Sequence, residues 1–370
     1  MVAPLDLARE RVMGKLSGIR VVDLSQFLPG PMLTVMMADQ GAEVIKIEPA
    51  AGDPARTQGP FENGHSIWFA NLNRGKTSVV LDLKSADGKA ALIDLIRTAD
   101  VFVEGFRPGV MARLGFGWDA VRSLNPRIVY CSISAFGQHG ALAQHPAHDM
   151  AVQALAGFLS VNDGDDGCPV VPGVAAADVA AGLTGLSAVL MALIGREQTG
   201  QGDYVDIAMF DSLLPWSAHI AGSALAGGAA PRSATQRSLG GAAFYNVYET
   251  ADGRHIVLGG REPKFARSLL GALGRPDLIA LAEAEAGEAQ APLIAFLRKT
   301  FAARSRDEWD KFMADLDVAY APVLDFAEAL AQPHVAERDR VRGHQIAPAI
   351  HFADDDWSPG LIPPLGGKAP

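Results

Sequence analysis

The stretch IRVVDLSQFLPGPMLTVMMADQGAEVIKIE, residues 19–48, decides the fold class of this chain. It begins with an apolar run (19–25) and ends with another (42–48), and each run is typical of a strand buried on both faces. The segment between them has prolines where a helix would begin and a glycine where it would end. A strand, a helix and a strand in this order predict a βαβ unit and therefore a parallel sheet.

The same alternation continues beyond this unit. Further strands are predicted at TSVVLDLK (77–84), DVFVEGF (100–106) and IVYCSISAFG (128–137), with a helix at DGKAALIDLIRTA (87–99). Residues 178–197 predict a long apolar helix. Strands that alternate with helices are typical of a doubly wound α/β domain, whose parallel sheet is covered on both faces.

Composition changes near residue 221, where the sequence becomes rich in glycine, alanine and serine. Such a stretch predicts a linker or a mobile loop over a site. Beyond it, residues 242–260 predict a β-hairpin that turns at Asp252-Gly253, and helices follow. We therefore expect a large domain over 1–220, a smaller α+β domain with its linker over 221–316, and a C-terminal segment, 317–370, that returns to the large domain.

The bulk composition excludes several classes of protein. The net charge of −10 argues against a nucleic-acid partner, because phosphate backbones are bound by clustered Lys and Arg. The two cysteines, Cys131 and Cys168, show neither a pairing nor a metal-ligand spacing, so we expect a reducing cytoplasmic location and no metal. Residues 1–18 lack the apolar core of a signal peptide. No run approaches about 18 consecutive apolar residues, so we expect no membrane partner.

Basic residues gather where predicted strands give way to helices. They are Arg56, Arg74, Lys76, Arg107 and Arg113. In open α/β sheets ligands bind outside the carboxyl ends of the strands, and cations there can hold phosphates by charge-assisted hydrogen bonds. The glycine fingerprint of a dinucleotide site is missing after the first strand, which leaves a different adenine nucleotide open as the ligand. Each of these cations could equally be a solvated surface residue.

Three titratable residues stand out as candidates for catalysis. His148, Asp178 and Glu262 lie far apart in sequence, but each is in a segment that predicts a turn or a helix start. A base, an acid and a carboxylate that orients the histidine are the groups needed to move a proton on and off carbon. Asp178 alone could instead be a nucleophile. The structural alternatives are a packed or capping His148, an Asp178 that only caps a helix, and a surface Glu262.

Several long blocks of the sequence resemble the class III CoA-transferase family, also called the CaiB/BaiF family. They include LSQFLPGPMLTVMMADQGAEVIKIEPAAGDPAR, NLNRGKTSVVLDLK, EGFRPGVMARLGFGWDAV, AHDMAVQALAGFLS and ADVAAGLTGLSAVLMALIGREQTGQGDYVDIAMFDSLL. The family includes formyl-CoA transferase and the alpha-methylacyl-CoA racemases. The resemblance implies a Rossmann-like large domain, a smaller second domain and an interlocked homodimer. It also implies an acyl-CoA substrate, with coenzyme A as part of the substrate and no permanently bound cofactor.

The resemblance also implies roles for single residues. Asp178 matches the aspartate that accepts the acyl group in the transferases and that is one of two acid/base groups in the racemases. The other racemase group is the histidine of a GHD motif, matched here by Ala147-His148-Asp149, and a glutamate of an EPxF motif, matched by Glu262, contacts it. Arg113 matches an arginine that contacts CoA phosphate. The other candidate CoA-binding residues are Arg107, Arg56, Arg74, Lys76 and Asp149.

Two reactions fit these matches, and a third hypothesis needs no reaction. Racemisation of a 2-methylacyl-CoA, with proton transfer between His148 and Asp178, is our first interpretation because all three racemase residue types are present. It includes the expectation that backbone N–H groups at the start of the 178–197 helix hold the thioester oxygen. CoA transfer is the alternative, supported by Gln153-Ala154 where racemases usually have an Asn-Tyr stretch. A CoA-binding scaffold without activity is the third hypothesis, and the intact Asp178 and His148 argue against it.

Overall fold

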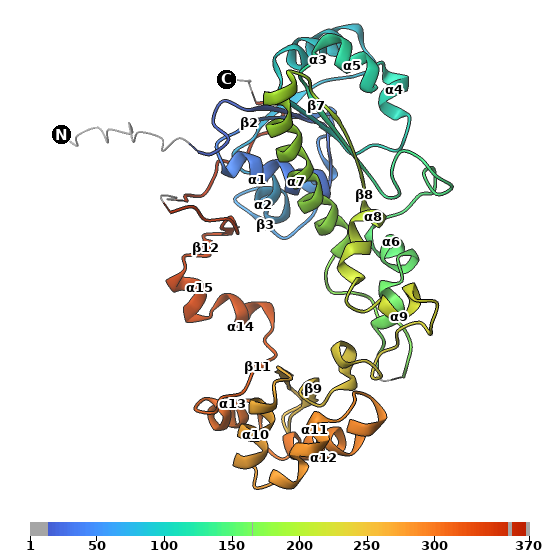
Figure 1. The fold of residues 1–370 in the computed structure, drawn as a ribbon. Helices are drawn as coiled ribbons and strands as arrows, with labels where there is room; N and C mark the ends of the chain where they lie inside the picture. The colour runs from blue at the N-terminus through green and yellow to red at the C-terminus, as the bar shows by residue number, and fades with distance from the viewer. Residues whose placement is uncertain (1–13, 165, 354–356, 368–370) are drawn as a thin grey trace, which may run out of the picture. The chain divides into compact units, whose positions relative to one another are not determined.

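The computed structural model describes residues 14–164, 166–353 and 357–367. The prediction that residues 1–18 contain no signal peptide therefore falls mostly on residues 1–13, outside the described residues. The chain divides into two compact units (Figure 1). The first comprises Met1–Ala156, Gly173–Pro215 and Pro333–Pro370, and the second comprises Gly157–Pro172 and Trp216–Gln332.

The first unit is built on a six-stranded sheet with the order β5-β2-β1-β6-β7-β8, in which every neighbouring pair is parallel. The strands are β1 (Arg20–Asp23), β2 (Glu43–Glu48), β5 (Thr77–Val80), β6 (Val101–Glu104), β7 (Val129–Ser134) and β8 (Tyr204–Ala208). The prediction of an α/β fold around a parallel sheet is therefore confirmed. From β1 the chain adds β2 and β5 on one side of the sheet and then β6, β7 and β8 on the other side. The carboxyl ends of β1 and β6 therefore flank a topological switch point.

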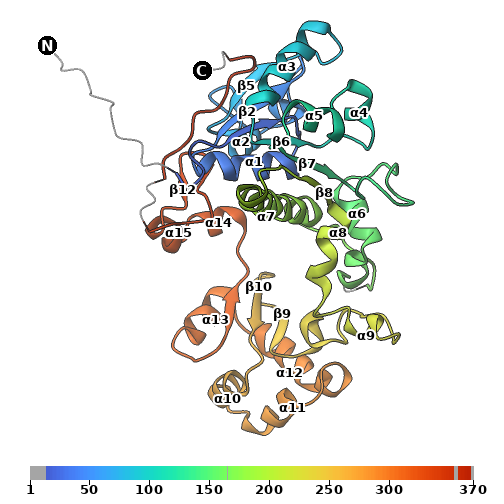
Figure 2. The same cartoon turned by 45° about the horizontal axis from the view of Figure 1, so that its top comes forward.

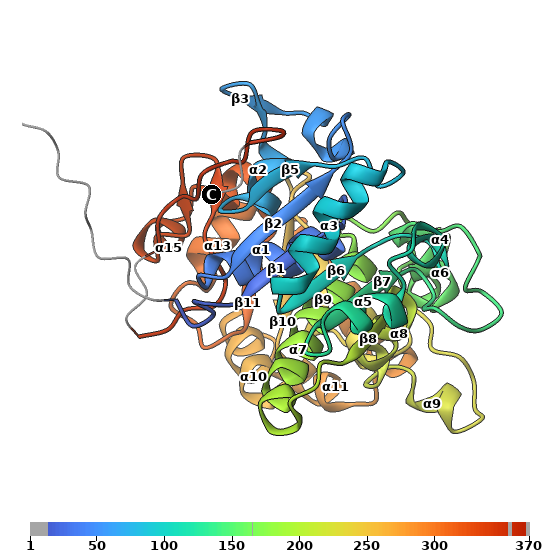
Figure 3. The same cartoon turned by 90° about the horizontal axis from the view of Figure 1, so that it is seen from above.

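Helices cover both faces of this sheet. Figure 3 views the face covered by α3 (Ala86–Thr98) and α5 (Trp118–Leu124), whose apolar side chains join those of β1 and β2 in one core cluster. Figure 2 shows α1 (Pro29–Asp39) and α7 (Ala176–Thr199) on the opposite face. The other helices of this unit are α2 (Ile67–Asn73), α4 (Val110–Leu114), α6 (Asp149–Leu155), α8 (Met209–Leu213), α15 (Pro333–Glu337) and the 3-10 helix η1 (Pro54–Thr57).

The close packing of α7 on α1 depends on two glycines. A methyl group at Gly182 would lie 2.9 Å from the Pro29 carbonyl oxygen, and one at Gly185 would lie 2.8 Å from Leu33 Cδ1. Bare glycines at these positions let the first turns of α7 approach the start of α1. This approach fixes where the N-terminal end of α7 lies relative to the loop that follows β1.

The helix α7 is also apolar and long enough, at 24 residues and a mean hydropathy of 1.8, to cross a membrane by composition alone. Within the first unit it packs on α1, β7 and β8 as a core helix does. A core helix of a folded domain passes the same test, so this single helix is weak evidence for a membrane span.

The C-terminal segment of the first unit contains the hairpin β12 (Val341–Arg342) and β13 (Gln345–Ile346), which docks on α2. The Asn71 side chain donates to the His344 carbonyl oxygen at 2.8 Å and accepts from the Ile346 N–H at 2.8 Å. A second short hairpin, β3 (Phe61–Glu62) and β4 (His65–Ser66), precedes α2.

The second unit holds a three-stranded antiparallel sheet, β11 (Tyr320–Pro322), β10 (His255–Gly259) and β9 (Tyr245–Glu249). Helices pack on it around the buried side chains of Tyr248, Phe301 and Trp309. The longer helices are α10 (Pro263–Ala272), α12 (Ala291–Phe301) and α13 (Arg306–Met313). Shorter ones are η2 (Phe158–Val161), α9 (Gly222–Leu225), η4 (Arg237–Gly241), η5 (Pro276–Leu278), α11 (Ile279–Glu283), η6 (Glu288–Gln290) and α14 (Phe326–Leu330), and η3 (Leu214–Ser217) lies at the boundary of the units.

The unit boundaries differ from the predicted ones in three places, because residues 157–172, 216–220 and 317–332 all belong to the second unit. Residues 317–332 belong to the second unit, because β11 pairs with β10 and so completes its sheet. Residues 157–172 also belong to the second unit, although the prediction placed them in the large domain. The membership of residues 317–332 is decided by pairing between distant strands, which the local sequence does not reveal.

Candidate active site

Asp178 lies in the first turn of α7 and is half-buried. Burial, and next the negative charge of Asp149, raise the pKa of the Asp178 carboxyl to about 7. At neutral pH this group is therefore divided between its protonated and its ionised form. A carboxyl with such a pKa can act as a general acid, a general base or a partly ionised nucleophile.

The Asp149 carboxylate holds the start of α7. Its Oδ1 accepts hydrogen bonds from the backbone N–H groups of Ala177, at 2.7 Å, and of Asp178, at 3.2 Å. Its Oδ2 accepts from Nε2 of Gln153 at 2.7 Å. These bonds make Asp149 a cap supplied from α6, whereas a CoA contact by the same carboxylate stays a prediction.

The backbone N–H groups of the first four residues of α7 have acceptors within the protein. Besides the two that Asp149 accepts, the N–H of Ala176 bonds to the Val174 carbonyl at 2.9 Å and that of Val179 to the Ala175 carbonyl at 3.0 Å. These bonds argue against the expectation that the same groups hold the thioester oxygen, because a helix start offers chiefly its unbonded N–H groups to a ligand, and that expectation stays a prediction.

His148 is brought to the same region by its neighbour in sequence. It caps the N-terminus of α6 with an extended backbone, and its side chain is exposed. Because Asp149 follows it directly and bonds to the Asp178 backbone, the main chain of His148 lies close to the start of α7. The predicted pairing of these two residues in one site is compatible with this arrangement.

The loop between β1 and α1 also reaches this region through Phe27. The ring of Phe27 lies edge-on to the His148 ring, with 6.2 Å between centroids and an interplanar angle of 85°. Phe27 has φ of +62°, in the left-handed region that a non-glycine residue adopts at a cost of roughly 1 kcal/mol or more. The turn is tight, since a methyl group at Gly30 would lie 2.2 Å from Ser25 Cβ.

Glu262 lies in the second unit, at the N-terminus of α10, and its side chain is exposed. The structure thus brings together Asp178, His148 and Asp149 within the first unit. A contact between Glu262 and His148 would join residues of different units and stays a prediction.

A cavity of about 540 Å³ opens at the carboxyl ends of β1, β2, β5 and β6. Its lining is mostly apolar and consists of Leu24, Gln26, Ile47, Glu48, Pro49, Ala50, Ala51, Leu81, Asp82, Leu83, Lys84, Phe106 and Leu114. This is the place where open α/β sheets bind ligands, beside the switch point between β1 and β6. The volume and lining suit a small-molecule site.

One exposed cation lines this cavity, and two more are next to lining residues in the sequence. Lys84 lines it, Arg107 directly follows the lining residue Phe106, and Arg113 directly precedes the lining residue Leu114. Cations at the rim of an apolar cavity suit a ligand with an apolar ring and several phosphates. Arg107 and Arg113 were candidates from the sequence, whereas Lys84 and Gln26 were missed. The signal for Lys84 was present, because it is a cation directly after a strand at the same edge of the sheet.

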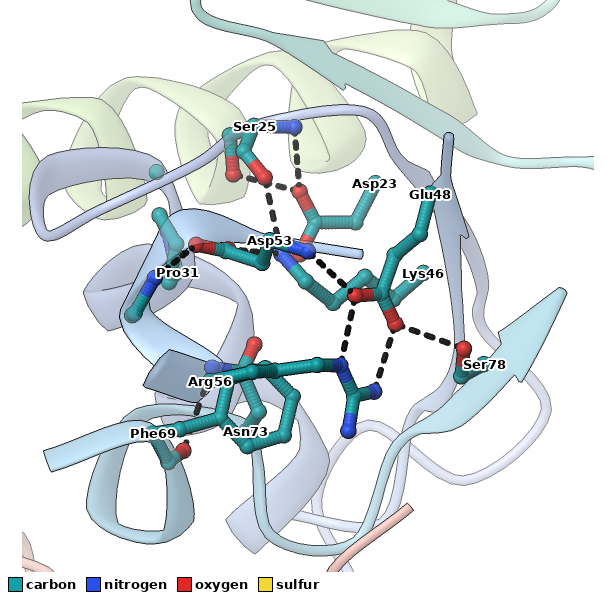
Figure 4. Close-up of polar contacts among 12 residues, drawn as sticks. Asp23, Ser25, Pro31, Lys46, Glu48, Asp53, Arg56, Phe69, Asn73 and Ser78 are labelled. Carbon is teal, nitrogen blue, oxygen red and sulfur yellow. Dashed lines mark hydrogen bonds and ion pairs between the residues drawn. The ribbon is translucent and has the colours of Figure 1, made fainter. Parts of the chain in front are cut away.

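The other predicted phosphate-binding cations have partners inside the protein. Lys76 pairs with Asp23 at 3.1 Å, with both side chains fully buried. Arg74 pairs with Asp39 at 2.7 Å, also buried. Arg56 forms two hydrogen bonds to Glu48, at 2.6 and 2.7 Å, and its guanidinium lies over the Phe69 ring (Figure 4). These ion pairs argue for a structural role and against the phosphate contacts expected for the three residues.

Comparison with known proteins agrees with this geometry. A model of CoA-transferase family III matches residues 16–351. The chain is 36% identical to the acetyl-CoA:oxalate CoA-transferase of Acetobacter aceti, over 88% of this chain and 85% of that protein. It is 31% identical to the succinyl-CoA:glutarate CoA-transferase of Homo sapiens, over 95% of this chain and 84% of that protein.

A solved structure shares the fold. It is a CaiB/BaiF family protein from Brucella suis, with a TM-score of 0.83 and 30% identity over 95% of this chain and 97% of that chain. The resemblance drawn from the sequence is thereby confirmed. The chain belongs to CoA-transferase family III, the CaiB/BaiF family.

Proposed function

We propose that this protein transfers coenzyme A between carboxylic acids, with Asp178 as the residue that accepts the acyl group. The observation that carries the proposal is that relatives aligned over most of their length are named as CoA-transferases. This reverses our first interpretation of the sequence, in which racemisation came before transfer. The alternative from the sequence becomes the principal function.

The reaction needs only the Asp178 carboxylate, the donor acyl-CoA and the acceptor carboxylic acid. The ionised carboxylate attacks the donor acyl-CoA, the C–S bond breaks, and an acyl-aspartyl anhydride and CoA thiolate form. The thiolate then attacks the aspartyl carbonyl, which releases the donor acid and leaves an aspartyl thioester of CoA. The acceptor carboxylate attacks that thioester to give a second anhydride and free thiolate. Attack of the thiolate on the acceptor acyl carbon yields the new acyl-CoA and restores Asp178.

The first unit offers a continuous place for CoA. The cavity at the carboxyl ends of the strands takes the nucleotide, and Lys84, Arg107 and Arg113 bind its phosphates. The loop after β1 borders both regions, because Gln26 lines the cavity and Phe27 contacts His148. The pantetheine arm can therefore follow this loop from the cavity toward Asp178.

The names of the relatives suggest the substrate class. They pair acetyl-CoA with oxalate and succinyl-CoA with glutarate. The proposal extends to short dicarboxylic acids as acceptors for this protein.

The assembly proposed is the interlocked homodimer implied by the family. Its support is apolar surface on α7, where Met191 is 70% and Ile194 67% exposed in the single chain. Apolar side chains this exposed are typical of surfaces that meet a partner. Light scattering on the purified protein would give the mass of a dimer, and the mass of a single chain would contradict it. A cytoplasmic location is proposed on the free thiols of Cys131 and Cys168.

Racemisation is the second candidate, because Asp149, the neighbour of His148, bonds to the Asp178 backbone and a pKa of about 7 for Asp178 suits proton transfer. One experiment separates the two reactions. The protein is incubated with a 2-methylacyl-CoA in deuterated water, and separately with succinyl-CoA and carbon-labelled glutarate. Label in glutaryl-CoA, with an aspartyl hydroxamate at residue 178 after hydroxylamine treatment, supports transfer. Deuterium at C2 of the acyl group without transfer of label would establish racemisation instead.

A further inference from the structure

We propose that Lys46 and Asp53 position the two loops between which the CoA nucleotide binds, by a buried ion pair beneath the cavity. This inference rests on the nucleotide site of the proposed function. It assigns to that site two positioning residues that do not themselves contact the ligand. Neither residue lines the cavity, and neither was a candidate from the sequence.

Lys46 connects the loops directly. Its Nζ donates a hydrogen bond to the Ser25 carbonyl oxygen at 2.8 Å and lies 2.8 Å from Oδ2 of Asp53 (Figure 4). The side chains of Lys46 and Asp53 are both fully buried. Ser25 belongs to the loop after β1, and Asp53 ends the loop after β2. The ammonium group of Lys46 thus links the two loops from below.

Both loops form walls of the cavity. Leu24 and Gln26 line it from the first loop, on either side of Ser25, and residues 49–51 line it from the second. A change in the distance between Ser25 and Asp53 would therefore change the width of the cavity.

Each end of the link is itself held. The Asp53 N–H donates to Oε2 of Glu48 at 2.8 Å, and Oδ1 of Asp53 accepts from the Ala55 N–H at 2.9 Å. On the other side, the Ser25 N–H donates to Oδ1 of Asp23 at 2.9 Å. The ion pair therefore connects two loops that are each held by other hydrogen bonds. It sets the distance between these loops and does not merely restrain a mobile one.

Stability alone is a poor explanation for the pair. Desolvation of two buried charges can offset their attraction, and an apolar pair of similar volume often stabilises a fold as well. An apolar pair could not, however, bind a loop carbonyl and fix the orientation of the backbone beside the cavity. We therefore expect its loss to affect the nucleotide more than the stability of the fold.

The test uses the full chain with the double variant Lys46→Met/Asp53→Asn, which leaves no unpaired buried charge. Calorimetry measures the Kd for CoA, and steady-state kinetics compare succinyl-CoA with succinyl-pantetheine, which lacks the nucleotide. We expect Kd for CoA to rise about tenfold or more and KM for succinyl-CoA to rise with kcat little changed. Kinetics with succinyl-pantetheine should equal those of the wild type. The single variant Asp53→Asn, which keeps the shape and the bond to Ala55, should give the same direction.

A control is Arg196→Met. It breaks another ion pair, between the buried Arg196 and the partly exposed Asp100 at 3.0 Å, where Asp100 precedes β6 at the amino edge of the sheet. This variant should bind CoA with wild-type affinity, even where its melting temperature falls. Wild-type CoA affinity in the folded double variant would overturn the inference, and so would an equal loss with succinyl-CoA and succinyl-pantetheine. Wild-type protein that binds no CoA would instead overturn the proposed function, from which the inference follows.

Discussion

The Asp149 carboxylate accepts a hydrogen bond from the backbone N–H of Asp178, at 3.2 Å, and so holds the proposed nucleophile by its main chain. The same carboxylate places a negative charge near the Asp178 side chain, which together with burial raises its pKa to about 7. Asp149 therefore fixes the position of Asp178 and also delays its ionisation. These two effects can be separated by substitution.

Replacing Asp149 with asparagine removes the charge while an amide oxygen can still accept the N–H bonds. We expect the acidic limb of the profile of kcat/KM against pH to move to lower pH, because the charge repulsion on Asp178 is lost. The pKa that this limb reports should stay above the ordinary pKa of an aspartate, since burial is the larger cause of the raised pKa of Asp178. Asp149→Ala is the comparison, because it loses the cap as well and should cost about 1 kcal/mol of stability. An unchanged profile in Asp149→Asn would show that the Asp149 charge does not reach the reacting group.

Asp178→Asn should abolish transfer and stabilise the fold at alkaline pH. A carboxyl whose pKa is raised in the folded state binds its proton more tightly there, so ionisation weakens the fold as pH rises through about 7. Asparagine resembles the protonated form and does not ionise. The variant should therefore be more stable than the wild type at pH 8, by a few kcal/mol at most, and the difference should vanish toward pH 4. Urea unfolding at both pH values measures this, and a difference independent of pH would contradict it.

His148→Ala distinguishes the two candidate reactions. Transfer proceeds through Asp178 alone, so the variant should keep transfer within about tenfold of the wild type. Proton transfer at C2 needs a second acid/base group, and its loss typically costs about 10² to 10⁴ in rate. Label exchange and C2 deuteration are measured on the same protein, with Phe27→Leu as the control for loss of the ring contact. A loss of transfer as large as the loss of deuteration would give His148 a direct part in transfer.

The sheet and its helices were predictable because their signals are local. Each strand of the parallel sheet contains β-branched apolar residues, and α1 has proline near its start and glycine after its end. The unit boundaries were not predictable, because the membership of residues 317–332 is decided by the pairing of β11 with β10. That pairing joins segments about 60 residues apart and leaves no local pattern.

The site shows the same division. Asp178 and His148 could be named from their motifs, but the use of the α7 N–H groups by Asp149 could not, because it is a contact between two helices. Lys76 directly precedes the predicted strand 77–84, and Lys84 is its last residue. One is buried against Asp23 and the other lines the cavity, and only the fold separates them. The sequence can therefore indicate which cations lie near a site, but it cannot show which of them contact the ligand.

Lys84 gives the most direct test of the nucleotide cavity. Its side chain is exposed at the rim, so Lys84→Met should leave the stability of the fold almost unchanged. A hydrogen bond to a charged group contributes about 1.5–3 kcal/mol, and about 1.4 kcal/mol corresponds to a tenfold change in Kd. We therefore expect CoA to bind at least about tenfold more weakly, with a reduced dependence of Kd on salt because one charge pair is lost. Succinyl-pantetheine, which lacks the phosphates, should react as it does with the wild type.

Lys89→Met is the matched control, because Lys89 follows in α3 and does not line the cavity. It changes the net charge of the protein by the same amount as Lys84→Met. If both variants weaken CoA binding equally, the effect is one of general charge and the phosphates lie elsewhere. If only Lys84→Met does so, and Arg113→Met adds a further loss to it, the phosphates lie at the carboxyl ends of β5 and β6. That result would be consistent with a pantetheine arm that follows the loop carrying Phe27 toward Asp178, in the first turn of α7.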